Sequence, residues 1–268
     1  MANIKCCKST NGETMENPIN IDKLKDLFSG MKDEIDHLNN NYKTNLINNL
    51  DIFFHNIRFM LKIYYANKEK TDIYLASDFN IFENIISPDE NKISDIIAFL
   101  LDPKESHGQK DIFYKKFVEI LEIKQNINYE KLSISRESPT LYIENSRRRI
   151  DITIDHDRRF AIGIENKPWA GEQIDQIKDY SEDLRKEYKD NYILIYLSGN
   201  GSEPNSISKE KREYLKRNNK LKSISYSIEL KFWLEECYKE CKADKIRWLL
   251  NDLISYIEDY FRISDFED

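Results

Sequence analysis

Residues 147–167 read RRRIDITIDHDRRFAIGIENK, and this stretch decides the fold that we expect for the chain. It holds two runs in which apolar and polar residues alternate, separated by a polar turn at Asp157 and Arg158. Side chains of a β-strand point alternately to opposite faces of a sheet, so the two runs predict a β-hairpin with one apolar face. We expect that face to carry Ile150, Ile152, Ile154, Phe160, Ile162 and Ile164.

The opposite face of the hairpin gathers charged side chains. A turn at the predicted place brings Asp151 across from Glu165, with Lys167 one pleat further along. Carboxylates about 5 Å apart repel each other unless a cation lies between them, and Mg²⁺ commonly binds one or two carboxylates together with phosphate oxygens. The pattern indicates metal-dependent hydrolysis of phosphodiester bonds, and a solvated face of mixed charge is the alternative.

These residues resemble a known signature. Ile150-Asp151, followed by Ile-Glu-Asn-Lys at 164–167, resembles the metal-binding motif of the PD-(D/E)XK nuclease superfamily, with Ile150 in place of the family's proline. The resemblance implies that Asp151, Glu165 and the carbonyl of Asn166 bind the metal and that Lys167 assists the attacking water. It implies Mg²⁺ as the cofactor, with Mn²⁺ as a substitute.

The order of the neighbouring segments fits the same family. Residues 80–200 read as helix, three strands, helix and strand, which predicts an α/β, restriction-endonuclease-like core: α-β-β-β-α-β, a central mixed sheet flanked by helices. The resemblance implies that Glu90, in the first core helix, reaches the metal; the alternative is a solvated residue favoured by the helix dipole. Glu137, on the strand expected before the hairpin, is a candidate accessory ligand.

A second motif follows the Glu-x-Lys sequence. Gln176 and Tyr180 form a QxxxY pattern at the start of the next expected helix, where residues four apart share one face. The pattern is similar to that of the RecB-like branch, in which this pair lies beside the metal and contacts the nucleic acid or the catalytic groups. We therefore include both residues in the expected catalytic set.

The charge distribution bears on the expected substrate. A net charge of −7 and a pI of about 5.4 argue against broad adhesion to nucleic acid, which depends on Lys and Arg. A local basic cluster is nevertheless expected to contact a phosphate backbone: Arg147, Arg148, Arg149, Arg158 and Arg159. The resulting hypothesis is a metal-dependent nuclease acting on DNA rather than RNA, in phage defence, restriction or repair. The alternative is a catalytically inactive, nuclease-like module that binds nucleic acid or protein.

The chain is expected to have three parts: a flexible tail (1–17), an N-terminal helical extension (18–70) and the nuclease-like domain (71–268), which ends in C-terminal helices. The extension has a heptad stripe that predicts either a homodimer or packing on the chain's own domain. The stripe consists of Ile21, Leu24, Phe28, Met31, Ile35, Leu38 and Tyr42, and a second helical stretch follows at 46–65. Without an apolar run of membrane-spanning length or a leader-like segment, we expect a cytoplasmic protein.

Overall fold

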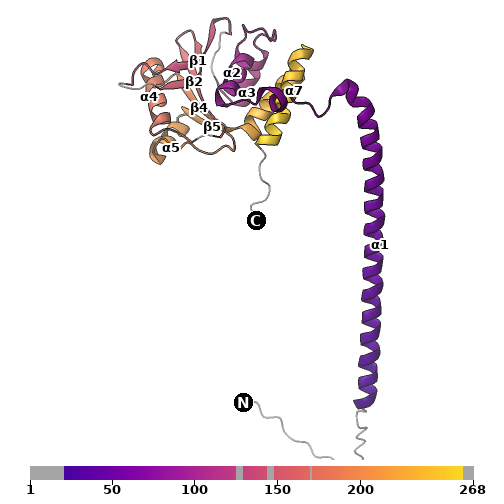
Figure 1. Cartoon of the computed structure of the whole chain (residues 1–268). Helices are drawn as coiled ribbons and strands as arrows, with labels where there is room; N and C mark the ends of the chain where they lie inside the picture. Colours follow the sequence, from indigo (N-terminus) through magenta and orange to yellow (C-terminus); the bar gives the residue numbers. More distant parts are fainter. Residues whose placement is uncertain (1–20, 125–128, 144–147, 170, 262–268) are drawn as a thin grey trace, which may run out of the picture. The chain divides into compact units, whose positions relative to one another are not determined.

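The structure is a computed structural model that describes residues 21–124, 129–143, 148–169 and 171–261 (Figure 1). Contacts divide the chain into two units, residues 1–77 and 78–268. This places the boundary seven residues beyond the one that we expected from the sequence, because the N-terminal helix continues further. The expected flexible tail, 1–17, lies outside the described residues.

The second unit is built around a five-stranded sheet with the order β1-β2-β3-β4-β5 (Figure 1). Strands β1, β2 and β3 pair antiparallel, whereas β3, β4 and β5 pair parallel, so the expected mixed sheet is confirmed. The strands are β1 (Leu132–Pro139), β2 (Arg149–His156), β3 (Phe160–Lys167), β4 (Tyr192–Ser198) and β5 (Leu221–Ser225).

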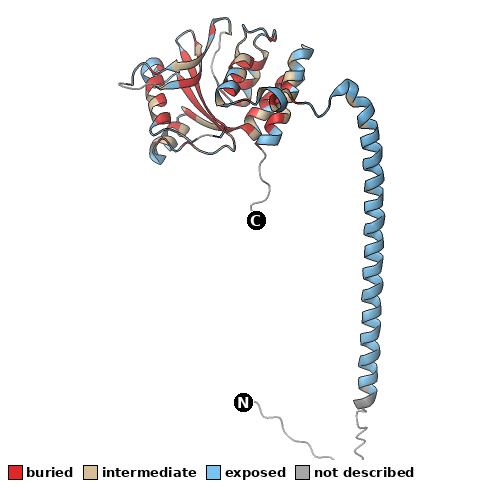
Figure 2. Ribbon diagram, viewed as in Figure 1, coloured by how far each residue is buried: buried red, intermediate tan, exposed pale blue. Residues whose placement is uncertain are grey.

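Helices cover both faces of this sheet and complete the expected α-β-β-β-α-β order. One face packs against α2 (Glu90–Leu101), α3 (Ile112–Ile120), α6 (Lys231–Glu240) and α7 (Asp244–Tyr260). The other face packs against α4 (Gln176–Tyr188) and α5 (Lys209–Arg217). Three short helices complete the described elements of this unit: η1 (Phe82–Ile86), η2 (Tyr129–Lys131) and η3 (Tyr226–Leu230). Strands β3 and β4 are buried along their whole length, as Figure 2 shows.

The hairpin of β2 and β3 turns where the sequence predicted. Asp157 and Arg158 both have left-handed backbones, with φ of 55° and 57°. The amide of Arg159 donates to the carbonyl of His156 at 2.9 Å, which closes the turn. The pairing of Ile152 with Ile164 then directs the polar residues of the two strands toward each other at the far end.

One expected side-chain position is wrong. Ile152 and Ile154 pack on the α2 face as expected, but Ile150 packs on the α4 face. The reason is an irregularity at Asp151: Glu137, the β1 residue opposite it, has a left-handed backbone (φ 51°), and neither residue joins the strand pairing. The strict alternation of β2 is therefore interrupted at the position that carries the carboxylate.

A glycine sets the distance between α4 and the sheet. A Cβ atom at Gly163 would lie 3.0 Å from Leu184 Cδ1 of α4 and 3.3 Å from Leu194 Cδ1 of β4. The missing side chain lets α4 approach the middle of β3 closely, as glycine in a strand often does. This close packing fixes the helix whose first residue is Gln176.

The N-terminal unit consists of one helix in its described part, α1 (Ile21–Leu75), 55 residues long. The two helices expected over 21–42 and 46–65 are therefore continuous. Nearly all described side chains of α1 are exposed, including its large apolar ones (Figure 2). Among the described residues, no helix has the length and apolar character needed to cross a membrane.

We predict that His156 makes the stability of the protein depend on pH. Its ring is buried, with Nε2 at 2.8 Å from the hydroxyl of Tyr114, and burial lowers its pKa from 6.5 to about 4. Because folding lowers this pKa, the contribution of neutral His156 to the free energy of unfolding is fully present above pH 6.5 and is lost as the pH drops toward 4. Between pH 7 and pH 5 the loss attributable to His156 should be about 2 kcal/mol.

Urea denaturation followed by tryptophan fluorescence measures the free energy of unfolding. Between pH 7 and pH 5, this free energy should fall by about 2 kcal/mol less in His156→Gln than in the wild type. His55→Gln, at an exposed position of α1, is the control and should behave as the wild type. An identical pH dependence in the wild type and His156→Gln would contradict the assignment.

Candidate active site

The charged residues of the hairpin meet two helix N-termini. Glu165 and Lys167 lie at the end of β3, Gln176 is the first residue of α4, and Glu90 is the first residue of α2. Asp151 and Glu165 are 6% and 0% exposed, so the cluster is buried. The structure thus brings together residues from four segments that the sequence places up to 86 positions apart, from Glu90 to Gln176.

Lys167 lies between two carboxylates. Its Nζ is 2.5 Å from Glu90 Oε1 and 2.8 Å from Glu165 Oε1. Burial by itself would lower the pKa of Lys167, but the interactions with Glu165 and Glu90 outweigh burial and raise it. Lys167 is therefore a fixed cation at neutral pH.

Asp151 and Glu165 each disfavour the charged form of the other in this buried site, even with Lys167 beside Glu165. Burial, followed by the charge of Asp151, raises the pKa of Glu165 to about 8. Burial also raises the pKa of Asp151, although the amide of Asn166 donates to Asp151 Oδ2 at 2.8 Å. Among the described residues, the buried Glu165 Oε2 has no hydrogen-bond partner. Further positive charge beside Glu165 would therefore be favourable.

These residues fit a hard divalent cation. The unpartnered Glu165 Oε2 is the type of ligand that Mg²⁺ prefers, and the main-chain oxygen of Asn166 faces the same cluster, 3.4 Å from Lys167 Nζ. In the described part of the chain, no group of three or more His, Cys, Asp or Glu side chains is arranged so that it could hold a metal ion. The short contacts of Lys167 explain this, because the ammonium group lies between Glu165 and Glu90.

The Gln-x-x-x-Tyr pair contacts the cluster directly. Gln176 is 5% exposed, and its Nε2 donates to Glu165 Oε1 at 2.6 Å and to the hydroxyl of Tyr180 at 3.1 Å. The Tyr180 hydroxyl donates in turn to the carbonyl of Arg149 at 2.6 Å. Helix α4 thereby fixes one oxygen of Glu165 and the start of β2, two residues before Asp151.

Two residues of the site were missed by the sequence analysis. Arg136 of β1 donates to the main-chain oxygen of Asp151 and pairs with Asp95 of α2 at 2.9 Å. Tyr226 of η3 donates to Asn166 Oδ1 at 2.5 Å. The position of Arg136 opposite β2 could have suggested its role, but Tyr226 follows Asn166 by 60 residues and no local pattern indicates the contact.

The arginines expected to bind nucleic acid do not form one group. Arg147 lies outside the described residues. Arg148 pairs with Asp179 at 3.2 Å, and the exposed Arg149 lies 3.9 Å from Glu137. Arg158 and Arg159 lie at the hairpin turn, before the first residue of β3, Phe160, which is itself about 17 Å along the strand from Glu165 at 3.3 Å per residue.

Of the proposed accessory ligands, Glu90 contacts the cluster through Lys167. Glu137 has a different partner: its carboxylate lies 3.9 Å from the guanidinium of Arg149, and its side chain is 41% exposed. We therefore leave Glu137 out of the ligand set proposed below.

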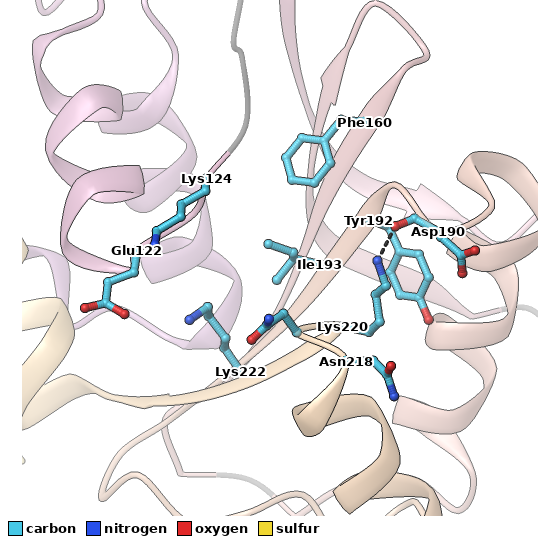
Figure 3. Close-up of a pocket in the computed structure, with 10 residues that line it drawn as sticks. Glu122, Lys124, Phe160, Asp190, Tyr192, Ile193, Asn218, Lys220 and Lys222 are labelled. Carbon is cyan, nitrogen blue, oxygen red and sulfur yellow. Dashed lines mark hydrogen bonds between the residues drawn. The ribbon is translucent and has the colours of Figure 1, made fainter.

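A cavity of about 380 Å³ lies at the other end of the parallel strands. Figure 3 shows Phe160 at the start of β3, Tyr192 at the start of β4 and Lys220 just before β5 along its wall. Lys220 donates to the carbonyl of Asp190 there. Because Glu165 and Lys167 lie at the opposite end of β3, this cavity is separate from the charged cluster.

The mixed sheet, the buried Asp151, Glu165 and Lys167, and the adjoining helix N-termini define a nuclease-like α/β protein. The family model of the PD-(D/E)XK nuclease superfamily matches residues 79–257, and the chain belongs to this superfamily. Members generally use divalent metals and act on nucleic acids. Comparison with the curated proteins and with the solved structures finds no match.

For the phosphodiester cleavage that we propose below, we predict that Gln176→Ala lowers kcat about tenfold, corresponding to roughly 1.4 kcal/mol of transition-state stabilisation. The variant loses the hydrogen bond that orients Glu165 Oε1. Gln173→Ala is a matched control, because Gln173 is exposed and its hydrogen bonds with Gln176 in the described structure use only main-chain atoms of Gln173. Equal activity of the two variants at saturating Mg²⁺ would show that Gln176 has no role in orientation.

Proposed function

We propose that the protein is a metal-dependent nuclease that hydrolyses phosphodiester bonds, with DNA as the preferred substrate. The observation that carries the proposal is the buried cluster of Asp151, Glu165 and Lys167, in which Glu165 keeps an unpartnered oxygen among the described residues. Phage defence, restriction or repair in the cytoplasm would use such an activity.

Each residue of the cluster has a distinct role in this proposal. Asp151, Glu165 and the carbonyl of Asn166 would hold Mg²⁺, or Mn²⁺ in its place. The ion supplies Lewis-acid activation of water and of the scissile phosphate when bound. Lys167, whose raised pKa keeps it charged, would donate hydrogen bonds and offset negative charge on the phosphate rather than remove a proton. Gln176 and Tyr180 would orient Glu165, as in the RecB-like branch.

A non-cutting module that binds nucleic acid or protein is the alternative. Its fold would be the same, but it would have no need for opposed, buried carboxylates, which cost free energy unless they are compensated. The intact set of Asp151, Glu165 and Lys167 therefore favours the enzyme. Incubating the protein with linear DNA, circular DNA and RNA, each with Mg²⁺, Mn²⁺ or chelator, distinguishes the two functions and the two substrates.

We predict that Asp151→Asn and Glu165→Gln each abolish metal-dependent cleavage. Either change removes a charged ligand with almost no change in volume, so the loss should exceed a hundredfold in kcat. It should not be accompanied by unfolding, because removing one of two opposed carboxylates relieves repulsion. A melting temperature measured in chelator that dropped steeply in both variants would contradict the proposed geometry.

The second part of the proposal concerns helix α1, which we propose pairs with α1 of a second copy of this chain. Because the helix is continuous, the heptad stripe of its first half extends into the second half with spacings of three and four residues, interrupted by one additional step of four at Leu46. The seam consists of Leu24, Phe28, Met31, Ile35, Leu38, Tyr42, Leu46, Leu50, Phe53, Ile57, Met60 and Tyr64.

The size and charge of α1 support a like partner. The seam from Leu24 to Tyr64 is about 60 Å long at 1.5 Å per residue. At about 60 Å² per side chain, twelve positions on each of two helices would bury about 1,400 Å², within the range of stable protein interfaces. Acidic and basic residues are equal in number along α1, so two copies would not repel each other through net charge.

We predict a dimer mass for the full chain in light scattering at about 10 µM. The double variant Ile35→Asp and Leu38→Asp should be monomeric, because each change would bury a charge in the seam. Thr44→Asp, outside the seam, should remain a dimer. A monomeric wild type would assign the stripe to packing within one chain.

A further inference from the structure

Three aromatic rings stack next to the catalytic lysine. Trp169 follows Lys167 by two residues, and its ring stacks on Phe261 with centroids 5.7 Å apart and planes inclined by 23°. Phe261 stacks on Tyr226 at 4.4 Å and 26°. Tyr226 and Phe261 are buried, at 1% and 8% exposed, whereas Trp169 is 52% exposed. Trp169 is thus the outer member of a supported stack.

The stack is tied to the catalytic cluster at its inner end. The Tyr226 hydroxyl donates to Asn166 Oδ1, and Asn166 Nδ2 donates to Ser94 Oγ of α2 at 2.9 Å. Asn166 lies between Glu165 and Lys167 in the sequence and is 0% exposed. The innermost ring and the proposed metal-binding carbonyl therefore belong to one rigid, hydrogen-bonded group.

A glycine at the end of β4 makes room for the stack. A Cβ atom at Gly199 would lie 2.6 Å from the carbonyl oxygen of Pro168 and 3.1 Å from Phe261 Cδ1. Both the segment that carries Trp169 and the ring beneath it pass directly over this glycine. The position of the exposed indole is therefore set by three separate segments.

We propose that the outer face of Trp169 stacks on one unpaired nucleobase of the substrate. The proposal rests on the proposed nuclease function and adds a substrate class: single-stranded DNA or a frayed DNA end. A base inside a duplex has both faces covered by its neighbours and cannot stack on an indole, whereas an unpaired base can. Every base has a π-face, and the platform would accept any sequence.

Covering Phe261 is the simpler role that Trp169 could have. A side chain that served only to cover the core would gain most by being buried, yet Trp169 is 52% exposed. The ring is also held in place by stacking before any ligand arrives, so little side-chain entropy remains to be lost on binding. Its closeness to Lys167 in the chain places a bound base next to the scissile phosphate.

The test compares three variants by fluorescence anisotropy in chelator, so that binding is measured without cleavage. Trp169→Phe keeps an aromatic face, and Trp169→Leu keeps apolar contact with Phe261 but removes that face. Trp248→Leu is the matched control, because Trp248 is 62% exposed on α7. The probes are a labelled single-stranded oligodeoxynucleotide and a labelled duplex whose two ends are closed by non-nucleotide polyethylene glycol linkers, so that it has no unpaired base.

We expect Trp169→Leu to bind the single strand about tenfold more weakly than the wild type, since stacking on one base contributes on this scale. Trp169→Phe should stay within about threefold and Trp248→Leu within about twofold. Duplex affinity should change less than twofold in all variants. Equal weakening on single strand and duplex would overturn the proposal, as would an unchanged Trp169→Leu.

A wild type that binds no single strand in chelator would also overturn the proposal. Cleavage of the same DNA in Mg²⁺ would then decide separately whether the nuclease function stands. The melting temperature of Trp169→Leu verifies that the variant is folded. If it is not, Trp169→Met, which also lacks an aromatic face, takes its place with the same expected loss of single-strand affinity.

Discussion

The buried contact between Lys167 and Glu165 is the interaction on which the site depends. A carboxylate with no exposed surface is costly unless it is paired, and Glu165 has both a lysine and the amide of Gln176 on one oxygen. The other oxygen lacks a partner among the described residues, and Asp151 adds a second carboxylate. This imbalance is what suits the site to a divalent cation rather than to a purely structural role.

The N-termini of two helices contribute to the electrostatics of the site. Helix α2 begins at Glu90 and α4 begins at Gln176, so the positive ends of both helix dipoles lie near the carboxylates. The close approach of Leu184 at Gly163 holds α4 in place, and Asn166 links β3 to α2 through Ser94. Packing and hydrogen bonds between β3 and the two helices thus help to determine the orientation of Glu165 and of the residues next to it.

The two units of the chain differ in how far their apolar side chains are buried. Residues 78–268 bury their own core on both faces of the sheet. Helix α1 presents large apolar side chains such as Phe28 and Met60, 67% and 68% exposed, along one seam. A helix of this length gains most of its stability from packing an apolar face, which is why the proposed pairing of two copies uses this seam.

The hairpin and the clustering of Asp151, Glu165 and Lys167 could be predicted from the sequence, because alternation with a period of two is a local property of the chain. The sequence also indicated that Gln176 and Tyr180 share one helix face. It did not determine the position of Ile150, since the irregularity at Asp151 depends on the backbone of Glu137 in a neighbouring strand. Nor did the sequence show that Arg158 and Arg159 lie away from the cluster, because residues that are close in the sequence of a hairpin can lie at its opposite ends in space. Only the tertiary structure placed Tyr226 on Asn166 and Phe261 beneath Trp169, since contacts between residues 60 and 92 positions apart follow from packing rather than from local pattern.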